Sequence, residues 1–488
     1  MMNDLMDSQA QQMDLQQATR RHFFSQCSMG LGSIALGSLL GDDLAKAARA
    51  NPFQPGKPHF QPRAKNVIYM FMAGGPSQLE LFDWKPELAR RSGGDIPESF
   101  IKGKRFAFMN STFKDQKKLL GPVKQFRRHG QAGMWFSDNI PHIGGIADEM
   151  TMFRTCKTNL FNHAPAKLFM NTGTGIFGRP SMGSWVTYGI GSETQSLPGF
   201  VVLTSEGGRN PQPIASRQWG AGFLPSRHQG VQFFSQGDPV HYVRSAPGVN
   251  REQQRGLVET LGKLNRLRNE RVANPEIDTR IAQYELAFRM QASVPELMDF
   301  SGEPQHVLDA YGVKGMDGSF AANCLLARRL AERGTRFIHL YHRGWDHHGD
   351  LERYMKICCG LCDHPSAALV KDLKARGMLD DTLVIWGGEF GRTPMFQGKG
   401  SAAGRDHHIR AFSMWLAGGG IKGGITHGET DELGYYATKD RVHVRDLHAT
   451  MLHLLGIDSQ RFTYRFQGLN ARLTGVEDEA HVVKSVVA

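Results

Sequence analysis

The sequence predicts an α/β fold, with a mostly parallel central sheet and helices on both faces. Two observations carry this prediction. Short apolar runs of strand type alternate with amphipathic helical segments along the chain. Two of these runs, 337–341 and 383–386, end abruptly in loops rich in acids and imidazoles. This is typical of strands whose carboxyl ends border a ligand site. Hydrophobic residues make up 40% of the 488 positions and charged residues 22%, as in ordinary globular proteins.

The first fifty residues are expected to be an export signal rather than part of the fold. Arg20 and Arg21 precede a Gly-rich, moderately apolar run, the pattern of a twin-arginine signal. That run is too short for a stable membrane span, and 48–50 (ARA) resembles a cleavage site. We therefore expect the twin-arginine machinery to deliver the protein to the periplasm or another extracytoplasmic space. The alternative is a cytosolic amphipathic helix with a chance arginine pair.

The rest of the chain divides into a lead-in, one domain and a tail. Residues 51–65 are Pro-rich and polar, an extended lead-in. Residues 66–475 are expected to form a single α/β domain with a helical insertion near 251–300, where charges recur at helical spacing. Residues 476–488 form a C-terminal tail. A Gly/Pro-rich loop at 207–225 is expected to shape one wall of a cleft.

Within the domain, apolar runs mark the strands and amphipathic segments closed by glycine mark the helices. Strands are expected at 66–72, 152–154, 197–203, 337–341, 383–386 and 412–416. Helices are expected at 140–149, 166–170, 251–271, 276–290, 319–333, 351–376 and 444–455. Two literal GxGxxG stretches, 173–178 and 418–423, lack the strand-to-helix context of a nucleotide site and are interpreted as turns.

Three polar loops are expected to form a metal site. Two follow the strands 337–341 and 383–386, and the third is the Gly-flanked stretch 404–408. The expected ligands are Asp346, His348, Glu389, Asp406 and His407. Mixed carboxylate and imidazole ligands suit zinc or manganese, and iron as a second choice, better than magnesium or calcium. An isolated surface His-Asp pair usually binds no metal, but three such clusters at strand ends and loops favour one.

The charge of the chain indicates which kinds of partner it can bind. The formal net charge of +11 favours anionic small molecules or glycans. The basic residues are scattered and no nucleic-acid motif accompanies them, so we do not expect nucleic acid as a partner.

Five cysteines follow the signal, three of them at 358, 359 and 362. An odd number fits poorly with a disulfide framework, so we expect buried thiols or one local disulfide.

Several ordered blocks resemble one exported family. They include GGPSQLELFDWKP, NHAPAKLFMNTG, GWDHHGD, GEFGRTP and GRDHH. On these blocks the chain resembles the domain of unknown function 1501 family, a sulfatase-like branch of the alkaline phosphatase superfamily, over nearly its whole length. The resemblance implies an alkaline phosphatase/sulfatase-like fold, with Asp346 and His348 as one metal pair and Asp406 and His407 supplying a late ligand.

The resemblance also shows departures from sulfatase chemistry. His163 stands where the formylglycine-forming Cys or Ser is expected, and Lys167 where an Arg is expected. Residues 73–75 (AGG) replace a pair of Asp residues. Formylglycine cannot form from His163. Catalysis would then use a metal-activated water, or His163 as nucleophile or general acid/base. Lys167 and Arg392 are expected to bind anionic oxygens or to form structural ion pairs.

Two functions follow from these residues. The first is an exported, metal-dependent hydrolase of sulfate or phosphate esters. The second is a non-catalytic exported binding protein that kept the fold and lost its chemistry, which the missing nucleophile supports. A cluster of Asp, Glu and His at one crevice favours the first, because buried charge without a use is costly.

Overall fold

The structure is a computed structural model. It describes residues 56–102, 117–208, 211–235, 238–240, 248–272, 274–398, 402–476 and 480–488. The expected export signal, residues 1–50, lies outside the described residues, as does the start of the lead-in. All described residues belong to one compact unit, Phe53–Ala488.

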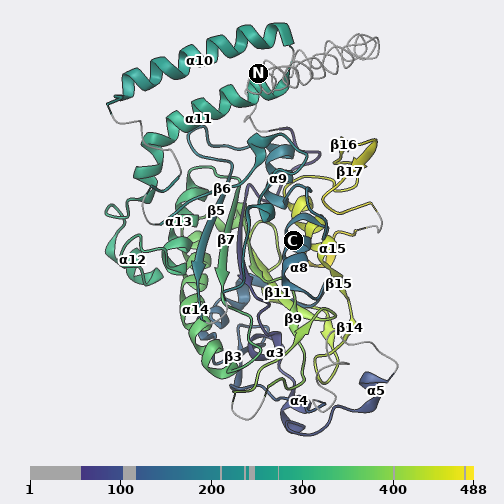
Figure 1. The fold of residues 1–488 in the computed structure, drawn as a ribbon. Helices are drawn as coiled ribbons and strands as arrows, with labels where there is room; N and C mark the ends of the chain where they lie inside the picture. Colours follow the sequence, from purple (N-terminus) through teal and green to yellow (C-terminus); the bar gives the residue numbers. More distant parts are fainter. Residues whose placement is uncertain are drawn as a thin grey trace, which may run out of the picture. The chain divides into compact units, whose positions relative to one another are not determined.

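A nine-stranded sheet forms the centre of this unit (Figure 1). The strands lie in the order β12-β4-β11-β8-β1-β7-β5-β6, and β15 pairs with β4. Their bounds are β1 Asn66–Ala73, β4 Met150–Lys157, β5 Phe200–Glu206, β6 Val231–Gln232, β7 Phe337–Arg343, β8 Thr382–Gly387, β11 Phe412–Ala417, β12 Ile425–His427 and β15 Val442–His443. Every pairing is parallel except those of β11, which runs antiparallel to β8 and β4. The predicted, mostly parallel sheet is confirmed.

Strand β1 shows why both faces of the sheet are covered. All of its residues are buried. Ile68 and Met70 belong to one hydrophobic core, whereas Tyr69 and Phe71 belong to another. Because successive side chains of a strand point to opposite faces, each face has its own core.

Helices complete the two cores. The first core includes residues of α13 Phe320–Glu332 and α14 Leu351–Ala375. The second includes residues of α8 His163–Thr172, α9 Met182–Ile190 and α15 Val444–Leu454. The prediction of helices on both faces is therefore confirmed.

Smaller elements surround this centre. The helices are α3 Gln78–Leu81, α4 Pro86–Arg90, α5 Glu98–Ile101, α7 Pro141–Gly144 and α12 Gln305–Tyr311. Four two-stranded sheets pair β2 Phe126–His129 with β3 Met134–Ser137, β9 Gly391–Arg392 with β10 His407–His408, β13 Glu429–Thr430 with β14 Ala437–Lys439, and β16 Tyr464–Phe466 with β17 Leu469–Ala471. Two long helices, α10 Arg251–Val272 and α11 Pro275–Met298, pack side by side at the predicted helical insertion (Figure 1).

Several predicted bounds differ from the structure. The helix expected at 276–290 is α11 Pro275–Met298, the helix expected at 166–170 is α8 His163–Thr172, and the strand expected at 197–203 is β5 Phe200–Glu206. Two further differences have an evident cause. The helix expected at 140–149 is only α7 followed by a 3₁₀ turn at Ala147–Glu149. The adjacent Gly144 and Gly145 disfavour a continuous helix there. The strand expected at 152–154 is the eight-residue β4. Its partners β11, β12 and β15 come from a distant part of the chain, so local pattern understates its length.

Two further predictions concern the cysteines and membrane-spanning helices. The five cysteines from Cys156 to Cys362 are buried free thiols, so of the two expected arrangements the structure shows buried thiols. Within the described part of the chain, no helix has the length and apolar character needed to cross a membrane.

His339 is a buried histidine in the middle of β7. Its side chain is 0% exposed, and its ring stacks on Tyr69 and Tyr341 at centroid distances of 4.9 and 4.1 Å. Neither ring nitrogen has a hydrogen-bond partner. Burial lowers the pKa of His339 from 6.5 to about 3, so the folded protein keeps this imidazole neutral.

This burial predicts a pH-dependent stability. Between pH 6.5 and about 3 the unfolded chain binds a proton on His339 that the folded chain does not, so the free energy of unfolding falls as pH falls. His339→Phe should remove this loss, up to about 1.4 kcal/mol per pH unit. Urea unfolding at pH 7 and pH 5 measures it, with exposed His306→Phe as control. An equal pH dependence in His339→Phe and wild type would contradict the prediction.

Candidate metal site

The site lies at one edge of the central sheet, where several strands end. β1, β4, β7 and β8 run in the same direction, so their carboxyl ends meet at this edge. β11 runs the opposite way and therefore begins there. The segments that follow β4 and β7 and the segment that precedes β11 supply His163, Asp346, His348 and His407. This matches the expectation that strand exits converge on one site.

The turn after β1 makes room for the loop that carries Asp346. Gly74 has a φ of +124°, and a Cβ there would lie 2.6 Å from the Asp346 backbone nitrogen. The Trp345 N–H donates to the Ala73 carbonyl at 3.2 Å, which holds the loop against the end of β1. The glycines that stand in place of the expected Asp pair thus allow the Asp346 loop to approach closely.

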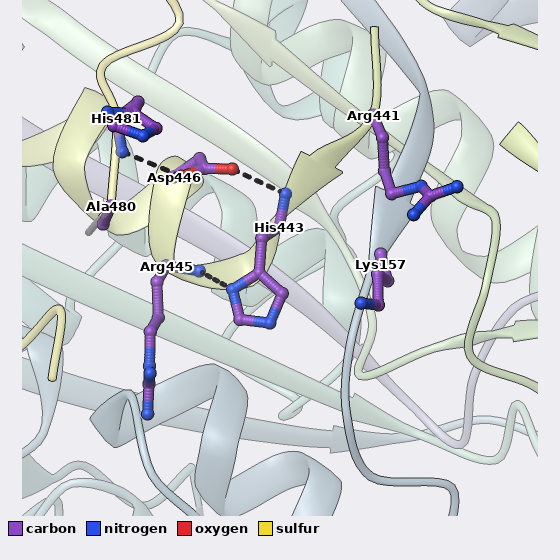
Figure 2. A pocket seen from close by; sticks show the side chains of 7 residues that line it. All are labelled: Lys157, Arg441, His443, Arg445, Asp446, Ala480 and His481. Atoms are coloured by element: carbon purple, nitrogen blue, oxygen red, sulfur yellow. Dashed lines mark hydrogen bonds between the residues drawn. The ribbon is translucent and has the colours of Figure 1, made fainter. Parts of the chain in front are cut away.

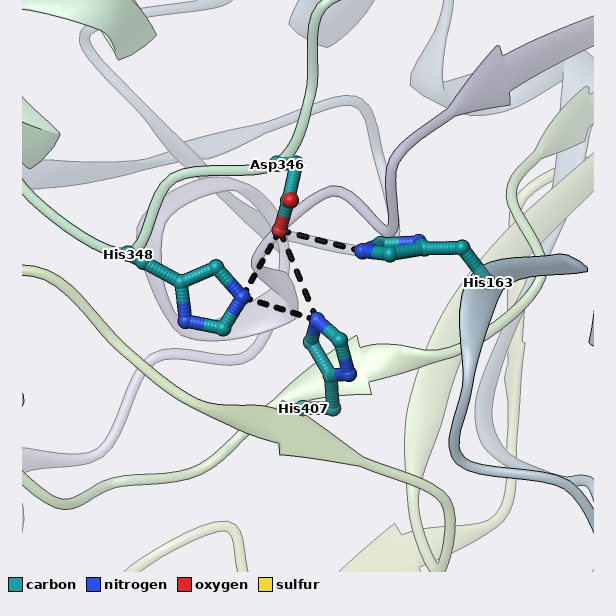
Figure 3. A group of neighbouring side chains, drawn as sticks. All are labelled: His163, Asp346, His348 and His407. Carbon is teal, nitrogen blue, oxygen red and sulfur yellow. Dashed lines mark hydrogen bonds and ion pairs between the residues drawn. The ribbon is translucent and has the colours of Figure 1, made fainter. Parts of the chain in front are cut away.

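Four side chains converge at this edge (Figure 3). One ligand atom from each lies within 4.8 Å of the other three. Around the Asp346 Oδ1 atom lie His163 Nε2 at 3.1 Å, His348 Nε2 at 3.0 Å and His407 Nε2 at 3.4 Å. The set offers three nitrogens and one oxygen, a combination that zinc and other transition metals accept.

The Nδ1 atom of each imidazole contacts an oxygen that can only accept a hydrogen bond. His163 Nδ1 lies 2.7 Å from Glu389 Oε1, and His407 Nδ1 lies 2.8 Å from the Phe161 carbonyl. His348 Nδ1 contacts the Gln397 side-chain oxygen. Each Nδ1 therefore carries a hydrogen, which leaves the Nε2 lone pair facing the cluster. Metal-binding histidines are held in this way.

Without a cation, the partners of these lone pairs are poor, and the Arg392 Nη1 atom lies 3.5 Å from His348 Nε2. The Nε2 atoms of His348 and His407 lie 2.9 Å apart, and two lone pairs that face each other at this distance repel. His163 Nε2 is buried, and the atom nearest to it in the group is the Asp346 Oδ1 at 3.1 Å. A metal ion at this position would satisfy all three nitrogens and the carboxylate, so the residues present fit a metal.

Glu389 contacts His163 on the side of the ring that faces away from the cluster. Its side chain is fully buried, and both of its oxygens accept from the Gly74 N–H at 3.1 Å. Burial alone would raise the pKa of Glu389, but its contact with His163 outweighs burial and holds that pKa below its usual range. Burial alone would lower the pKa of His163, but its contacts with Asp346 and Glu389 outweigh burial and raise that pKa above its usual value.

Asp346 is ionised and held on both oxygens. Arg392 Nη2 donates to Oδ1 at 2.7 Å, and Gln212 Nε2 donates to Oδ2 at 2.9 Å. Burial would raise the pKa of Asp346, but Arg392 and the surrounding histidines hold it well below its usual range. Burial lowers the pKa of His407 to about 3, so its imidazole is neutral at pH 7.

The structure brings together most residues predicted from the sequence. Asp346, His348 and His407 join the cluster as expected, and His163, expected as a catalytic group, lies with them. Asp406 Oδ1 instead accepts from the His407 backbone N–H at 2.8 Å, and burial raises the Asp406 pKa. Asp406 and Glu389 lie outside the four-residue group, and their part as ligands stays a prediction.

The two basic residues expected at the site lie beside it. Lys167 is buried, its Nζ donates to the Pro213 carbonyl, and burial lowers its pKa. Arg392 is 1% exposed and donates to the carbonyls of Gly74, Gly75 and Arg405 as well as to Asp346.

Sequence reasoning missed the residues that orient the ligands. Gln397 and the Phe161 carbonyl have no distinguishing pattern in the sequence. Gln212 had a weak signal, because the Gly/Pro-rich loop 207–225 was expected to line a cleft, and Gln212 in that loop contacts Asp346.

One comparison with known proteins shows the family. The family model described as protein of unknown function (DUF1501) matches residues 64–487. A search of curated protein sequences finds no significant match.

Several solved structures are similar at low identity. The lipoteichoic acid synthase LtaP from Listeria monocytogenes has a TM-score of 0.37 and 10% identity, covering 89% of this chain and 81% of that one. The PsFucS1 sulfatase from Pseudoalteromonas sp. has a TM-score of 0.33 and 12% identity, covering 90% and 77%. A protein in the alkaline phosphatase superfamily from Vibrio parahaemolyticus has a TM-score of 0.34 and 11% identity, covering 86% and 77%. Likenesses this weak carry no argument about activity.

The geometry predicts which substitutions remove a metal. Asp346→Ala combined with His407→Ala should abolish binding, and His163→Ala should reduce it strongly, because each removes an atom of the four-residue group. Elemental analysis of purified protein measures the stoichiometry, expected near one per chain in wild type.

Asp406→Asn is the matched control, because Asp406 is a ligand in the sequence-based set but lies outside the four-residue group. It should retain the metal. Full occupancy in the double variant would reject the cluster as the metal site. Loss of metal from Asp406→Asn would instead support the sequence-based ligand set.

Proposed function

The chain belongs to the family of proteins of unknown function DUF1501, and we propose that it is an exported, metal-dependent hydrolase of sulfate or phosphate esters. One observation carries the proposal. Three imidazole Nε2 atoms, each with its Nδ1 bonded to an acceptor, face the Asp346 carboxylate at one edge of the sheet. Such a donor set suits zinc, manganese or iron.

Some residues of this site would bind the metal, and others hold those ligands in position. His163, Asp346, His348 and His407 would hold the metal. Glu389 and Gln397 fix two of the imidazoles, and Arg392 and Gln212 fix the carboxylate. When bound, a divalent metal supplies Lewis-acid charge stabilisation and makes a water more acidic.

Lys167 is the residue best suited to bind the ester group itself. Its ammonium has three donors, and Pro213 accepts one of them. It lies close enough to Asp346 and Glu389 for their charges to act on it. We propose that Lys167 binds a non-bridging oxygen of the sulfate or phosphate. Arg392 donates through all three of its nitrogens within the protein, so its role is to position Asp346.

His163 has a different role here from that of the nucleophile it replaces in sulfatases. Its Nδ1 is bonded to Glu389 and its Nε2 faces the cluster, so both ring nitrogens are engaged once a metal is present. We therefore propose that His163 is a ligand, and that a water attacks the sulfur or phosphorus. The ester oxygen then leaves as the alcohol with a proton from that water.

One observation favours a second candidate function, a binding protein without catalysis. Arg392 Nη2 lies 2.7 Å from Asp346 Oδ1, the oxygen that faces the three histidines. A buried arginine can neutralise this carboxylate without a metal. Such a protein would contain no stoichiometric metal and hydrolyse no ester.

Hydrolysis of simple esters tests the catalytic proposal. Metal-loaded wild type should cleave an aryl sulfate or an aryl phosphate, lose this activity in EDTA and regain it with added metal. Glu389→Gln should lower kcat/KM about 10- to 100-fold, because it weakens the bond that orients His163. Exposed Glu429→Gln is the matched control. No cleavage of either ester by protein with full metal content would reject the hydrolase.

Export is a separate part of the proposal and has its own test. Arg20→Lys combined with Arg21→Lys should leave the protein in the cytoplasm, because the twin-arginine signal is an address read by a receptor. Arg49→Lys is the control, and wild type should be found outside the cytoplasm beginning at Asn51. Cell fractionation and N-terminal sequencing measure this. A double variant exported as well as wild type would contradict the proposed route.

A further inference from the structure

Phe390 is a buried aromatic residue that contacts two of the three histidines in the metal cluster. The centroid of its ring lies 4.9 Å from that of His163 and 4.5 Å from that of His407, with interplanar angles of 40° and 35°. The two imidazoles contact each other at a centroid distance of 4.3 Å. The phenyl ring, which is 1% exposed, therefore completes a group of three rings in mutual contact.

The neighbours of Phe390 in the chain contact the same two histidines. The preceding residue, Glu389, lies 2.7 Å from His163 Nδ1. Strand β9 follows directly and pairs with β10, where His407 lies opposite Arg392 in the register. The backbone of Phe390 is thus fixed between a residue that orients His163 and a strand that pairs with His407.

Gly75 makes room for the phenyl ring. A Cβ at this position would lie 2.7 Å from both Cδ2 and Cε2 of Phe390, which is closer than non-bonded carbons pack. The Gly75 carbonyl accepts from Arg392 Nε at 2.9 Å, and the Arg392 guanidinium carbon lies 6.0 Å from the phenyl centroid. The ring of Phe390 therefore contacts the glycine turn after β1 as well as the two imidazoles.

Helix packing fixes the backbone of His163 but not the tilt of its ring. His163 begins α8, and α15 contacts the other end of that helix, where Arg445 Nε donates to the Gly173 carbonyl at 3.1 Å. His443 and Asp446 form a capping box at the start of α15 (Figure 2). The Nδ1 contact of the imidazole holds one nitrogen, and the ring can still turn about that contact and swing its Nε2 away from the cluster.

We propose that Phe390 is a positioning residue that sets the angle between the His163 and His407 imidazoles. The inference rests on the proposed metal site but not on hydrolysis. Packing against both rings removes the rotation that a contact at one nitrogen leaves, and a flat aromatic face can touch two rings at once. Supporting contacts that hold ligands in place raise metal affinity.

Metal affinity tests this role. Phe390→Leu removes the flat face and should weaken zinc binding about tenfold, because both imidazoles can then turn. Titration of Zn²⁺ into metal-free protein, in competition with a chromophoric chelator, measures the change. Phe390→Met also removes the ring, and its flexible side chain fills irregular gaps, so it serves if the leucine variant does not fold. It should weaken zinc binding in the same direction.

Phe136→Leu is the matched control. Phe136 is 0% exposed, belongs to the first core and contacts the ring of Phe82 at a centroid distance of 6.0 Å. Its loss should lower stability but leave zinc affinity unchanged, and thermal unfolding of both metal-free variants compares their stability. Equal zinc affinity in Phe390→Leu and wild type would overturn the proposal. An equal loss in both variants would do the same, because general destabilisation would then explain it.

The spectrum of bound cobalt reports the ligand arrangement directly. Co²⁺ binds sites of nitrogen and oxygen ligands, and its visible absorption bands depend on their geometry. At saturating Co²⁺ the bands should shift in Phe390→Leu and stay unchanged in Phe136→Leu. Unchanged bands in Phe390→Leu would overturn the positioning role. Wild type that binds neither ion would overturn the metal site as well, whereas the expected shifts without any ester hydrolysis would support Phe390 and overturn only the hydrolase.

Discussion

The site depends on the close approach of the Asp346 loop to the glycine pair after β1. A side chain at position 74 would collide with the Asp346 and Trp345 backbone, so the loop could not take its place. Asp346 Oδ1 would then lose its position among the three histidine nitrogens. Arg392 strengthens the same approach, since it bonds to Asp346 and to the carbonyls of Gly74 and Gly75.

The cluster forms only when the sheet is complete. His163 follows β4, Asp346 follows β7 and His407 precedes β11, so the donors come from segments far apart in sequence. The contact between His163 and Glu389 alone spans 226 residues. Correct register of β4, β8 and β11 is therefore a condition for the site, because the sheet side-chain period is two and a one-residue slip would turn each side chain to the other face.

The sequence predicts much of the fold and part of the site. Apolar runs locate the buried strands, and acids and imidazoles after them single out Asp346, His348 and His407. The position of His163 in the sequence does not show that it lies beside them. Its place depends on how β4 and the antiparallel β11 pair in the sheet, and these pairings join distant segments. The three Nδ1 atoms contact Glu389, a glutamine side chain and a backbone carbonyl. No sequence pattern marks the glutamine or the carbonyl, so only the folded structure identifies them.

Charge at this edge bears on the anionic substrate that we propose. Lys167 lies close enough to Glu389 and Asp346 for their charges to act on it. The chain as a whole has a net charge of +11. Positive charge concentrated in a recess with low-dielectric walls raises the local concentration of anions and speeds their association. A metal ion at the cluster would add to the same field. The buried acids there, Asp346 and Glu389, contact the Arg392 guanidinium and the His163 imidazole, and these contacts hold the ligands in place.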